Sequence, residues 1–302
     1  MRAYNRPMER KVDVAINVYG KPLQTAVTLF SLMKHSGRHI DRIFFIQEKK
    51  QPPGTGFDLI VEKLGDRLDV HVPRYFLWTY PLKLLRPLLR LKAFRQSLRY
   101  QYAWEQTDKD YLFITHNDVL YHDDVVGYFL ENVGEHIAAG QVGMCWSCSA
   151  RAADLCSGER YLAFRPSVEQ YAELTRRFPE QRAGIHKRFA HKGSAWPLPE
   201  CRLNEWACLI NMNLARPLTM PQGDILPFGA MMLDIGTEWF FQVHQHGYTV
   251  KHLDLTGYAH HAWTTSDASG HRVLFDRGAY EDGEDAARRL LEAQTHFQPF
   301  FL

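Results

Sequence analysis

The chain has 302 residues, of which 45% are hydrophobic and 23% charged, and its formal net charge is +2. This length and composition allow a large core and exclude a disordered chain, while the nearly neutral charge balance gives no global reason to expect nucleic acid as a partner. No apolar run is long enough to cross a bilayer, and the N-terminal MRAYNRPMERK lacks the apolar core of a signal peptide. We therefore expect a cytoplasmic protein.

Apolar runs typical of buried strands alternate with helical patterns in the first quarter of the chain. The run VDVAINVYG ends in a glycine turn, and the apolar spacing after it predicts a helix that stops at Gly37. This alternation favours a doubly wound sheet. The expected elements are strands at 12–20, 41–46 and 68–72 and helices at 23–37 and 57–64.

A basic segment follows at 74–99, with seven Lys or Arg side chains and no acidic residue. Pro81 and Pro87 interrupt it, which disfavours one long helix lying on a membrane. Three interpretations remain open: a positive funnel for a diphosphate, a face that contacts anionic lipid, or a solvated helix surface.

The stretch YLFITHNDVLYHDD at 111–124 is the most informative part of the chain. Its first five residues read as a buried strand, which ends in the polar cluster His116, Asn117 and Asp118. Asp123 and Asp124 then precede an amphipathic helix, where an N-cap is expected. Ligands bind at the carboxyl ends of strands in open α/β sheets, and a carboxylate there can hold a divalent cation against phosphate oxygens.

The HND at 116–118 and the acidic helix start after it resemble the Asp-x-Asp motif of GT-A-fold, nucleotide-sugar-dependent glycosyltransferases, especially the family-2-like ones. The resemblance implies an α/β, Rossmann-like, mostly parallel sheet flanked by helices, with an irregular acceptor-side lobe. It also implies a single domain over 1–302. Residues 1–144 would form its nucleotide-sugar half, and 145–302 its acceptor-side half, with a cysteine-containing insertion at about 145–215.

The resemblance also assigns roles to particular residues. Asp118 would bind the metal that bridges the donor diphosphate, while His116 stands where the family has its first Asp. Each assigned side chain has an ordinary structural alternative, as a packing, turn or surface residue. The further donor-site candidates are Asn17, Tyr19 and Lys21 after the first strand, Glu48 after the second, Arg99 and Gln101 before the motif strand, and Asn117 within the motif.

Cysteines gather after the motif. Cys145 and Cys148 form a C-x-x-C pair, Cys156 follows closely, and Cys201 is more distant. Four thiolates could hold a structural zinc ion, with no open position for chemistry. The alternative is that these cysteines are small buried apolar residues.

The second half of the chain offers several carboxylates as a catalytic base. A capping box at Ser167 and Gln170 predicts a helix to Phe178, and residues 204–216 read as an amphipathic helix with Glu205 in its first turn. The segment 226–248 resembles the acceptor-side region of the family. An inverting transferase needs a carboxylate that removes the proton of the acceptor hydroxyl. Asp234 is the first candidate, Glu205 the second and Glu238 the third.

Near the C-terminus, a strand is expected at 249–255, and the pair His260 and His261 follows it. These residues resemble the family segment that returns a histidine to the metal, and His261 is favoured over His260. A shell of imidazole nitrogen, carboxylate and phosphate oxygen suits Mn²⁺, with Mg²⁺ as the alternative that prefers oxygen.

The sequence therefore suggests a metal-dependent glycosyltransferase that moves a sugar from a nucleotide sugar, with UDP as the expected nucleotide, to a hydroxyl acceptor. The acceptor could be a glycan, a lipid-linked molecule or another hydroxyl compound, and 74–99 could bring the protein to the inner membrane. Two alternatives stay open. One is a sugar-phosphate nucleotidyltransferase, and the other is a catalytically silent scaffold or lipid-surface module, stabilised by zinc, on the same fold.

Overall fold

The structure is a computed structural model, and it describes residues 11–77, 86–143, 147–179, 195–231, 233–265 and 276–295. Its strands are β1 (Val12–Val18), β2 (Ile40–Gln47), β3 (Leu68–His71), β4 (Tyr111–Thr115), β5 (Val119–Tyr121), β6 (Ala138–Val142), β7 (Leu203–Asn211), β8 (Val250–His252) and β9 (Ala259–His261). Its longer helices are α1 (Pro22–Ser36), α2 (Asp58–Leu64), α4 (Gln101–Gln106), α5 (Val125–Asn132), α7 (Val168–Arg177), α10 (Thr237–Gln245) and α11 (Arg277–Thr295). Single helical turns form α3 (Lys92–Arg95), α6 (Ser149–Ala152) and α9 (Met212–Ala215), and 3-10 turns form η1 (Gly37–His39), η2 (Gly65–Arg67) and η4 (Arg86–Arg90).

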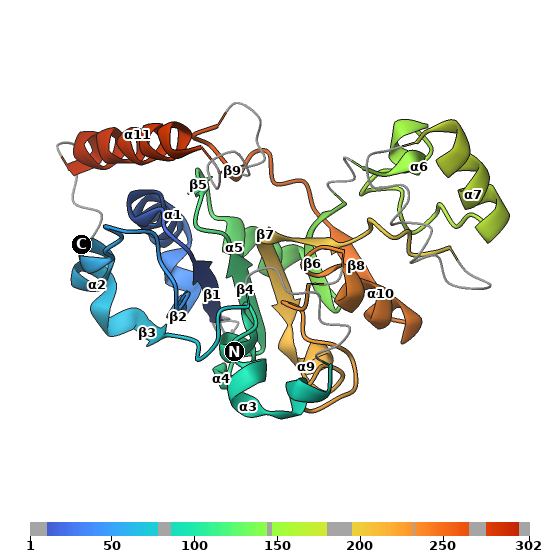
Figure 1. Cartoon of the computed structure of the whole chain (residues 1–302), viewed down its shortest axis with the longest axis horizontal. Helices are drawn as coiled ribbons and strands as arrows, with labels where there is room; N and C mark the ends of the chain where they lie inside the picture. Colours follow the sequence, from blue (N-terminus) through green and yellow to red (C-terminus); the bar gives the residue numbers. More distant parts are fainter. Residues whose placement is uncertain are drawn as a thin grey trace, which may run out of the picture.

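Seven of the described strands form one sheet in the order β3-β2-β1-β4-β7-β6-β8. The strands β3, β2, β1 and β4 run parallel to one another, and β6 runs parallel to β8. Among the described strands of this sheet, only β7 runs antiparallel to both of its neighbours, β4 and β6. The predicted α/β fold with a mostly parallel sheet flanked by helices is therefore confirmed (Figure 1).

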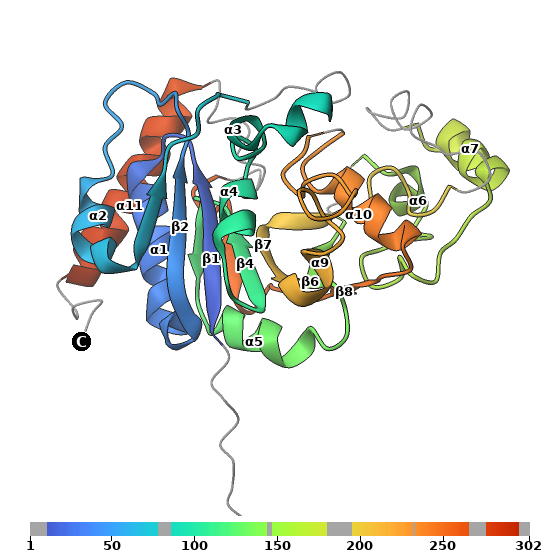
Figure 2. The ribbon, with the colours of Figure 1, turned by 90° about the horizontal axis from the view of Figure 1, so that it is seen from below.

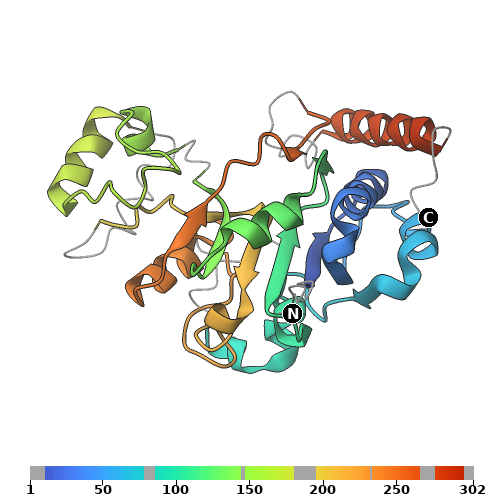
Figure 3. The same cartoon turned by 180° about the vertical axis from the view of Figure 1, so that it is seen from behind.

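Both faces of the sheet are buried. Successive strand residues point to opposite faces, so Phe44 belongs to one hydrophobic cluster and Phe45 to the other. Trp104 of α4 and Trp239 of α10 cover the first face, while α1 and α5 lie together on the second (Figure 3). The helices α6 and α7 form a lobe near the β8 end of the sheet, and α11 packs against α1 (Figure 1).

The helix predicted at 204–216 is wrong. Residues 203–211 form β7, a central strand with every residue buried, and only the single turn α9 follows it. A strand buried on both faces shows no two-residue alternation, and Leu and Ala made the same run look helical. Glu205 consequently lies on a strand and not in the first turn of a helix.

Most other element predictions in the described residues are confirmed. Asp124 is the N-cap of α5, with its side chain accepting a hydrogen bond from Gly127 N, and Ser167 and Gln170 form the predicted capping box of α7. Both motifs are local in sequence, because a side chain next to the helix accepts a hydrogen bond from a free N–H group of the first helical turn.

Candidate metal and donor site

The candidate site lies where β1 and β4 end, at the carboxyl edge of the parallel strands. These neighbouring strands run parallel, so Lys21 after β1 and Asp118 after β4 meet at one edge. A small antiparallel sheet of β5 and β9 supplies the third segment, because Val119 pairs with His261. The backbone N–H of Ala262 also donates to the carbonyl of Asp118, at 2.8 Å.

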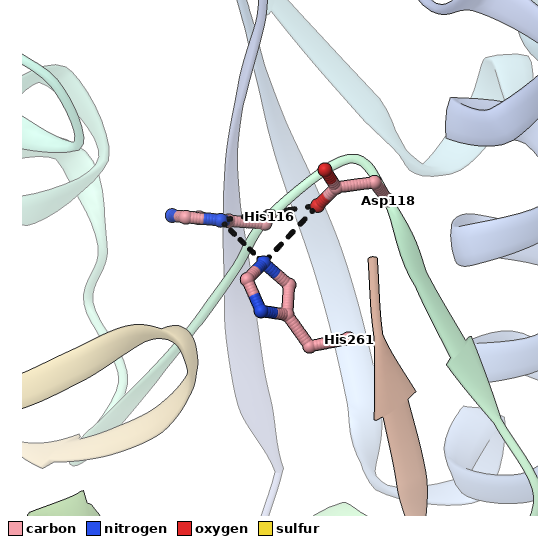
Figure 4. A group of neighbouring side chains, drawn as sticks. All are labelled: His116, Asp118 and His261. Carbon is pink, nitrogen blue, oxygen red and sulfur yellow. Dashed lines mark hydrogen bonds and ion pairs between the residues drawn. The ribbon is translucent and has the colours of Figure 1, made fainter. Parts of the chain in front are cut away.

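Three potential metal ligands converge here, and they come from segments more than 140 residues apart (Figure 4). The Nδ1 atom of His116 lies 3.3 Å from Nε2 of His261, and Oδ1 of Asp118 lies 3.5 Å from His261 Nε2 and 3.9 Å from His116 Nδ1. The circle through these three atoms has a radius of about 2.1 Å, which matches the roughly 2.0–2.2 Å bonds of divalent transition metals to nitrogen and oxygen. The three residues therefore fit a single divalent ion.

The Asp118 carboxylate is buried and paired with Lys21. Its Oδ2 accepts a hydrogen bond from Nζ of Lys21 at 2.7 Å, and both side chains are less than a tenth exposed. Burial raises the pKa of Asp118, but the Lys21 charge and the two imidazoles outweigh burial, so this pKa is held well below its usual range. Its Oδ1 accepts no hydrogen bond from the described residues. A buried acceptor without a donor is unusual, and here it faces the two histidines.

A second polar chain leads away from His116. Its Nε2 lies 3.4 Å from Oε1 of Glu205. Nη1 of Arg202 lies 3.6 Å from Oε2 of Glu205 and 2.8 Å from Oδ2 of Asp234. Burial raises the pKa of Glu205, but Arg202 and His116 lower it by more, so Glu205 stays ionised. The Trp206 ring stacks on His261 with centroids 5.4 Å apart. Sequence reasoning missed Arg202 and Trp206, because both roles depend on β7 being a strand beside β4.

Asn17 and Glu48 form a buried pair at the ends of β1 and β2. Asn17 Nδ2 donates to Glu48 Oε1 at 2.8 Å, and burial raises the pKa of Glu48 against that hydrogen bond and the charge of Arg99. The remaining oxygens, Asn17 Oδ1 and Glu48 Oε2, accept no hydrogen bond from the described residues. Tyr19, two residues after Asn17, lies with its ring 5.9 Å from the ring of Phe76.

The other predicted residues have local contacts. Asn117 donates to Thr25 Oγ1, Gln101 donates to the Met220 carbonyl, and Arg99 forms an isolated β-bridge with Gly229. Glu238 accepts from Gln242 on the same helix. His260 is exposed on β9, because neighbouring strand residues point to opposite sides, and it does not join His261 at the ligand triad.

The zinc prediction stays a prediction. Cys148, Cys156 and Cys201 belong to one hydrophobic cluster, and burial raises the thiol pKa of Cys156 to about 11 and that of Cys201 well above its usual range. Among the described residues, these sulfurs do not form a group of three ligand atoms within 4.8 Å of one another. Cys145, the fourth predicted ligand, lies outside the described residues.

No family model matches the chain, and no curated protein matches it. Solved structures of glycosyltransferases do align with it. Glucosyl-3-phosphoglycerate synthase of Mycobacterium tuberculosis, in complex with Mn²⁺, UDP and phosphoglyceric acid, is 11% identical over 82% of this chain and 69% of that chain, with a TM-score of 0.41. TarS 1–349 of S. aureus with UDP is 12% identical over 82% and 59%, with a TM-score of 0.42. The bifunctional WbbM glycosyltransferase is 12% identical over 68% of this chain, which spans only 32% of that protein, with a TM-score of 0.36. Similarities this low assign neither family nor activity.

Proposed function

We propose that the protein is a metal-dependent glycosyltransferase that moves a sugar from a nucleotide sugar, with UDP as the nucleotide, to an acceptor hydroxyl. The observation that carries the proposal is the group of His116, Asp118 and His261, which forms at the carboxyl edge of the sheet with Lys21 beside it. That edge is where open α/β sheets bind their ligands. A lysine beside a metal group is well suited to a diphosphate.

The two imidazole nitrogens and one carboxylate oxygen favour Mn²⁺ over Mg²⁺, because Mg²⁺ prefers oxygen ligands. A bound ion supplies Lewis acidity that neutralises charge growing on the leaving diphosphate. His116, Asp118 and His261 would hold it, and the remaining coordination positions would be open to phosphate oxygens and water.

Lys21 adds a second positive charge at the same place. Its Nζ forms an ion pair with Asp118. Lys21 itself is the N-cap residue of α1 and has a left-handed backbone conformation. Phosphate oxygens arriving beside Asp118 would give this ammonium group new partners. Preorganised positive charge of this kind stabilises a transition state without reorganisation during the reaction.

The Asn17 and Glu48 pair would recognise the nucleoside. Uracil presents an N–H donor between two carbonyl groups, and the buried Glu48 Oε2 is an acceptor without a donor among the described residues. Leaving such a group unpaired is costly, so a ligand that supplies the missing donor gains selectivity over one that does not. Ribose hydroxyls could serve Asn17 Oδ1 in the same way.

Asp234 remains the first candidate for the catalytic base. Its side chain is 28% exposed, so an acceptor hydroxyl can reach it, whereas Glu205 is buried between His116 and Arg202. Glu238 lies in the first turn of α10 and bonds to Gln242. We infer that Asp234 takes the proton from the acceptor in an inverting reaction and that Glu205 orients His116. The acceptor would be a glycan, a lipid-linked molecule or another hydroxyl compound.

Thermal unfolding of the metal-stripped protein tests this function. UDP with Mn²⁺ should raise the melting temperature, and each component alone should raise it much less, because the diphosphate and the ion complete each other's site. Ligand at about 100 times its Kd stabilises the native state by about 2.7 kcal/mol. Hydrolysis of the UDP-sugar without acceptor, dependent on the metal, would show the chemistry.

The neighbouring histidines provide a matched pair of variants. His261→Ala and Asp118→Ala should lose the joint effect of UDP and Mn²⁺, while His260→Ala, one residue from His261 but exposed, should keep it. A shift that persists in Asp118→Ala would contradict the site. If no nucleotide shifts the melting temperature of the wild type in the presence of Mn²⁺, the silent scaffold becomes the better description.

A further inference from the structure

The basic segment presents an outward surface that the proposed catalytic site does not use. We call it the η4 face, and it consists of Arg86, Leu88, Arg90, Leu91 and Lys92. All five residues are exposed, and the two leucines are 38% and 60% exposed. Among the described residues, none of its three cations lies within ion-pair distance of a carboxylate. The face therefore combines free positive charge with exposed apolar side chains.

Packing beneath the face fixes this exposure. Leu89, Phe94 and Leu98 point inward and form a hydrophobic cluster with Leu226 and Ala230. The next basic residue, Arg95, also turns inward, and its Nε donates to Glu105 at 2.6 Å. The segment is therefore amphipathic, with one side anchored in the protein and the other side apolar and cationic.

The η4 face lies at the same edge of the sheet as the candidate site. The segment that follows the carboxyl end of β3 packs on α3, because Tyr75 N donates to Ser97 Oγ and the Tyr75 ring lies 5.9 Å from the Phe94 ring. Figure 2 shows α3 near the ends of β1 and β2 that lie opposite the entry of the chain into β1, and η4 packs against α3. Exposed Lys50 and Arg74 extend the positive charge at this edge.

We infer that the η4 face binds the surface of an anionic lipid bilayer, with Leu88 and Leu91 entering the interface and the cations contacting lipid phosphates. Neither the two leucines nor the cations are sufficient alone, because stable peripheral binding needs an apolar contribution together with a polybasic one. A nucleic acid would use the cations but would leave two leucines exposed, so lipid is the better match. The inference does not depend on the proposed transferase activity. Binding through the η4 face would turn the sheet edge that carries the candidate site toward the membrane.

Co-sedimentation with vesicles tests the inference on the full chain. Binding is expected to vesicles in which about a third of the phosphatidylcholine is replaced by phosphatidylglycerol, to be weak with phosphatidylcholine alone, and to fall with added salt. Each basic residue at such a surface contributes about fivefold to partitioning, so the double substitution Arg90→Gln/Lys92→Gln should reduce partitioning onto the vesicles about 25-fold. The double substitution Leu88→Ser/Leu91→Ser should reduce partitioning at least several-fold while the charge is unchanged.

Matched controls come from exposed residues elsewhere. Leu155→Ser removes a leucine that is 46% exposed on another part of the molecule, and Lys251→Gln/Arg289→Gln removes two exposed cations from β8 and α11. Both controls should bind vesicles like the wild type. Equal losses in the controls, or no loss in the η4 variants, would overturn the assignment. So would binding of polyuridylate by the η4 face with no binding of anionic vesicles.

Discussion

His116 is the residue that most distinguishes the candidate metal group, because it adds a nitrogen ligand where the resembled motif has a carboxylate. If its Nδ1 binds the ion, replacement by an oxygen ligand should change metal preference. We choose His116→Asn, because an aspartate would place a second carboxylate against Glu205, only 3.4 Å from the present imidazole. The ratio of Mg²⁺-supported to Mn²⁺-supported activity should rise by about tenfold. His260→Asn, on the exposed side of β9, should leave the ratio unchanged.

Glu205 and Asp234 both form ion pairs with Arg202, but substitutions of these two residues should have different kinetic effects. Glu205→Gln loosens the orientation of His116, so the Mn²⁺ concentration for half-maximal rate should rise by about 10–100-fold, with kcat recovered at saturating Mn²⁺. Asp234→Asn removes the proposed base, so kcat should fall by about 10²–10⁴ while Mn²⁺ and UDP bind normally. Direct Mn²⁺ titration by electron paramagnetic resonance separates the two. The opposite pattern would make Glu205 the base.

At the scale of elements, local signals in the sequence were sufficient for several elements of the first half of the chain. Caps, glycine stops and apolar runs report on a few neighbouring residues, so β1, α1 and α5 could be predicted closely from their own segments. β7 could not, because a fully buried run carries no period that separates a strand from a helix.

That one element explains most of what was missed at the site. β7 pairs antiparallel with β4, and the backbone N–H of His116 donates to the carbonyl of Trp206, which places Glu205 and Arg202 beside His116. The pairing of β5 with β9 was equally invisible, because three-residue strands carry little signal and their partners are far apart in sequence. The resemblance pointed to Asp118, His261 and His260 as metal ligands and to His116 as a donor-site residue. The structure brings His116 to Asp118 and His261 and leaves His260 outside this group.

At the scale of the whole molecule, one hydrophobic cluster joins the sheet to the α6 and α7 lobe. It lies below α10 and extends into the lobe through aromatic rings. His244 lies within this junction, and its ring is 5.1 Å from Trp196 and 4.2 Å from Phe240. A titratable group at such a place couples global stability to pH.

The last prediction concerns this histidine. Burial lowers the pKa of His244 to about 4, although its hydrogen bond with the Phe240 carbonyl opposes the shift. The folded pKa lies below the unfolded value of about 6.5, so between these values the unfolded chain binds more protons and stability falls as the pH decreases. The loss from His244 should reach about 2 kcal/mol by pH 5, relative to pH 7.5. Urea unfolding at several pH values measures it. His244→Gln, which cannot titrate, should be less stable at pH 7.5 but should lose about 2 kcal/mol less on acidification, and an unchanged pH slope in this variant would show that His244 is not the group responsible.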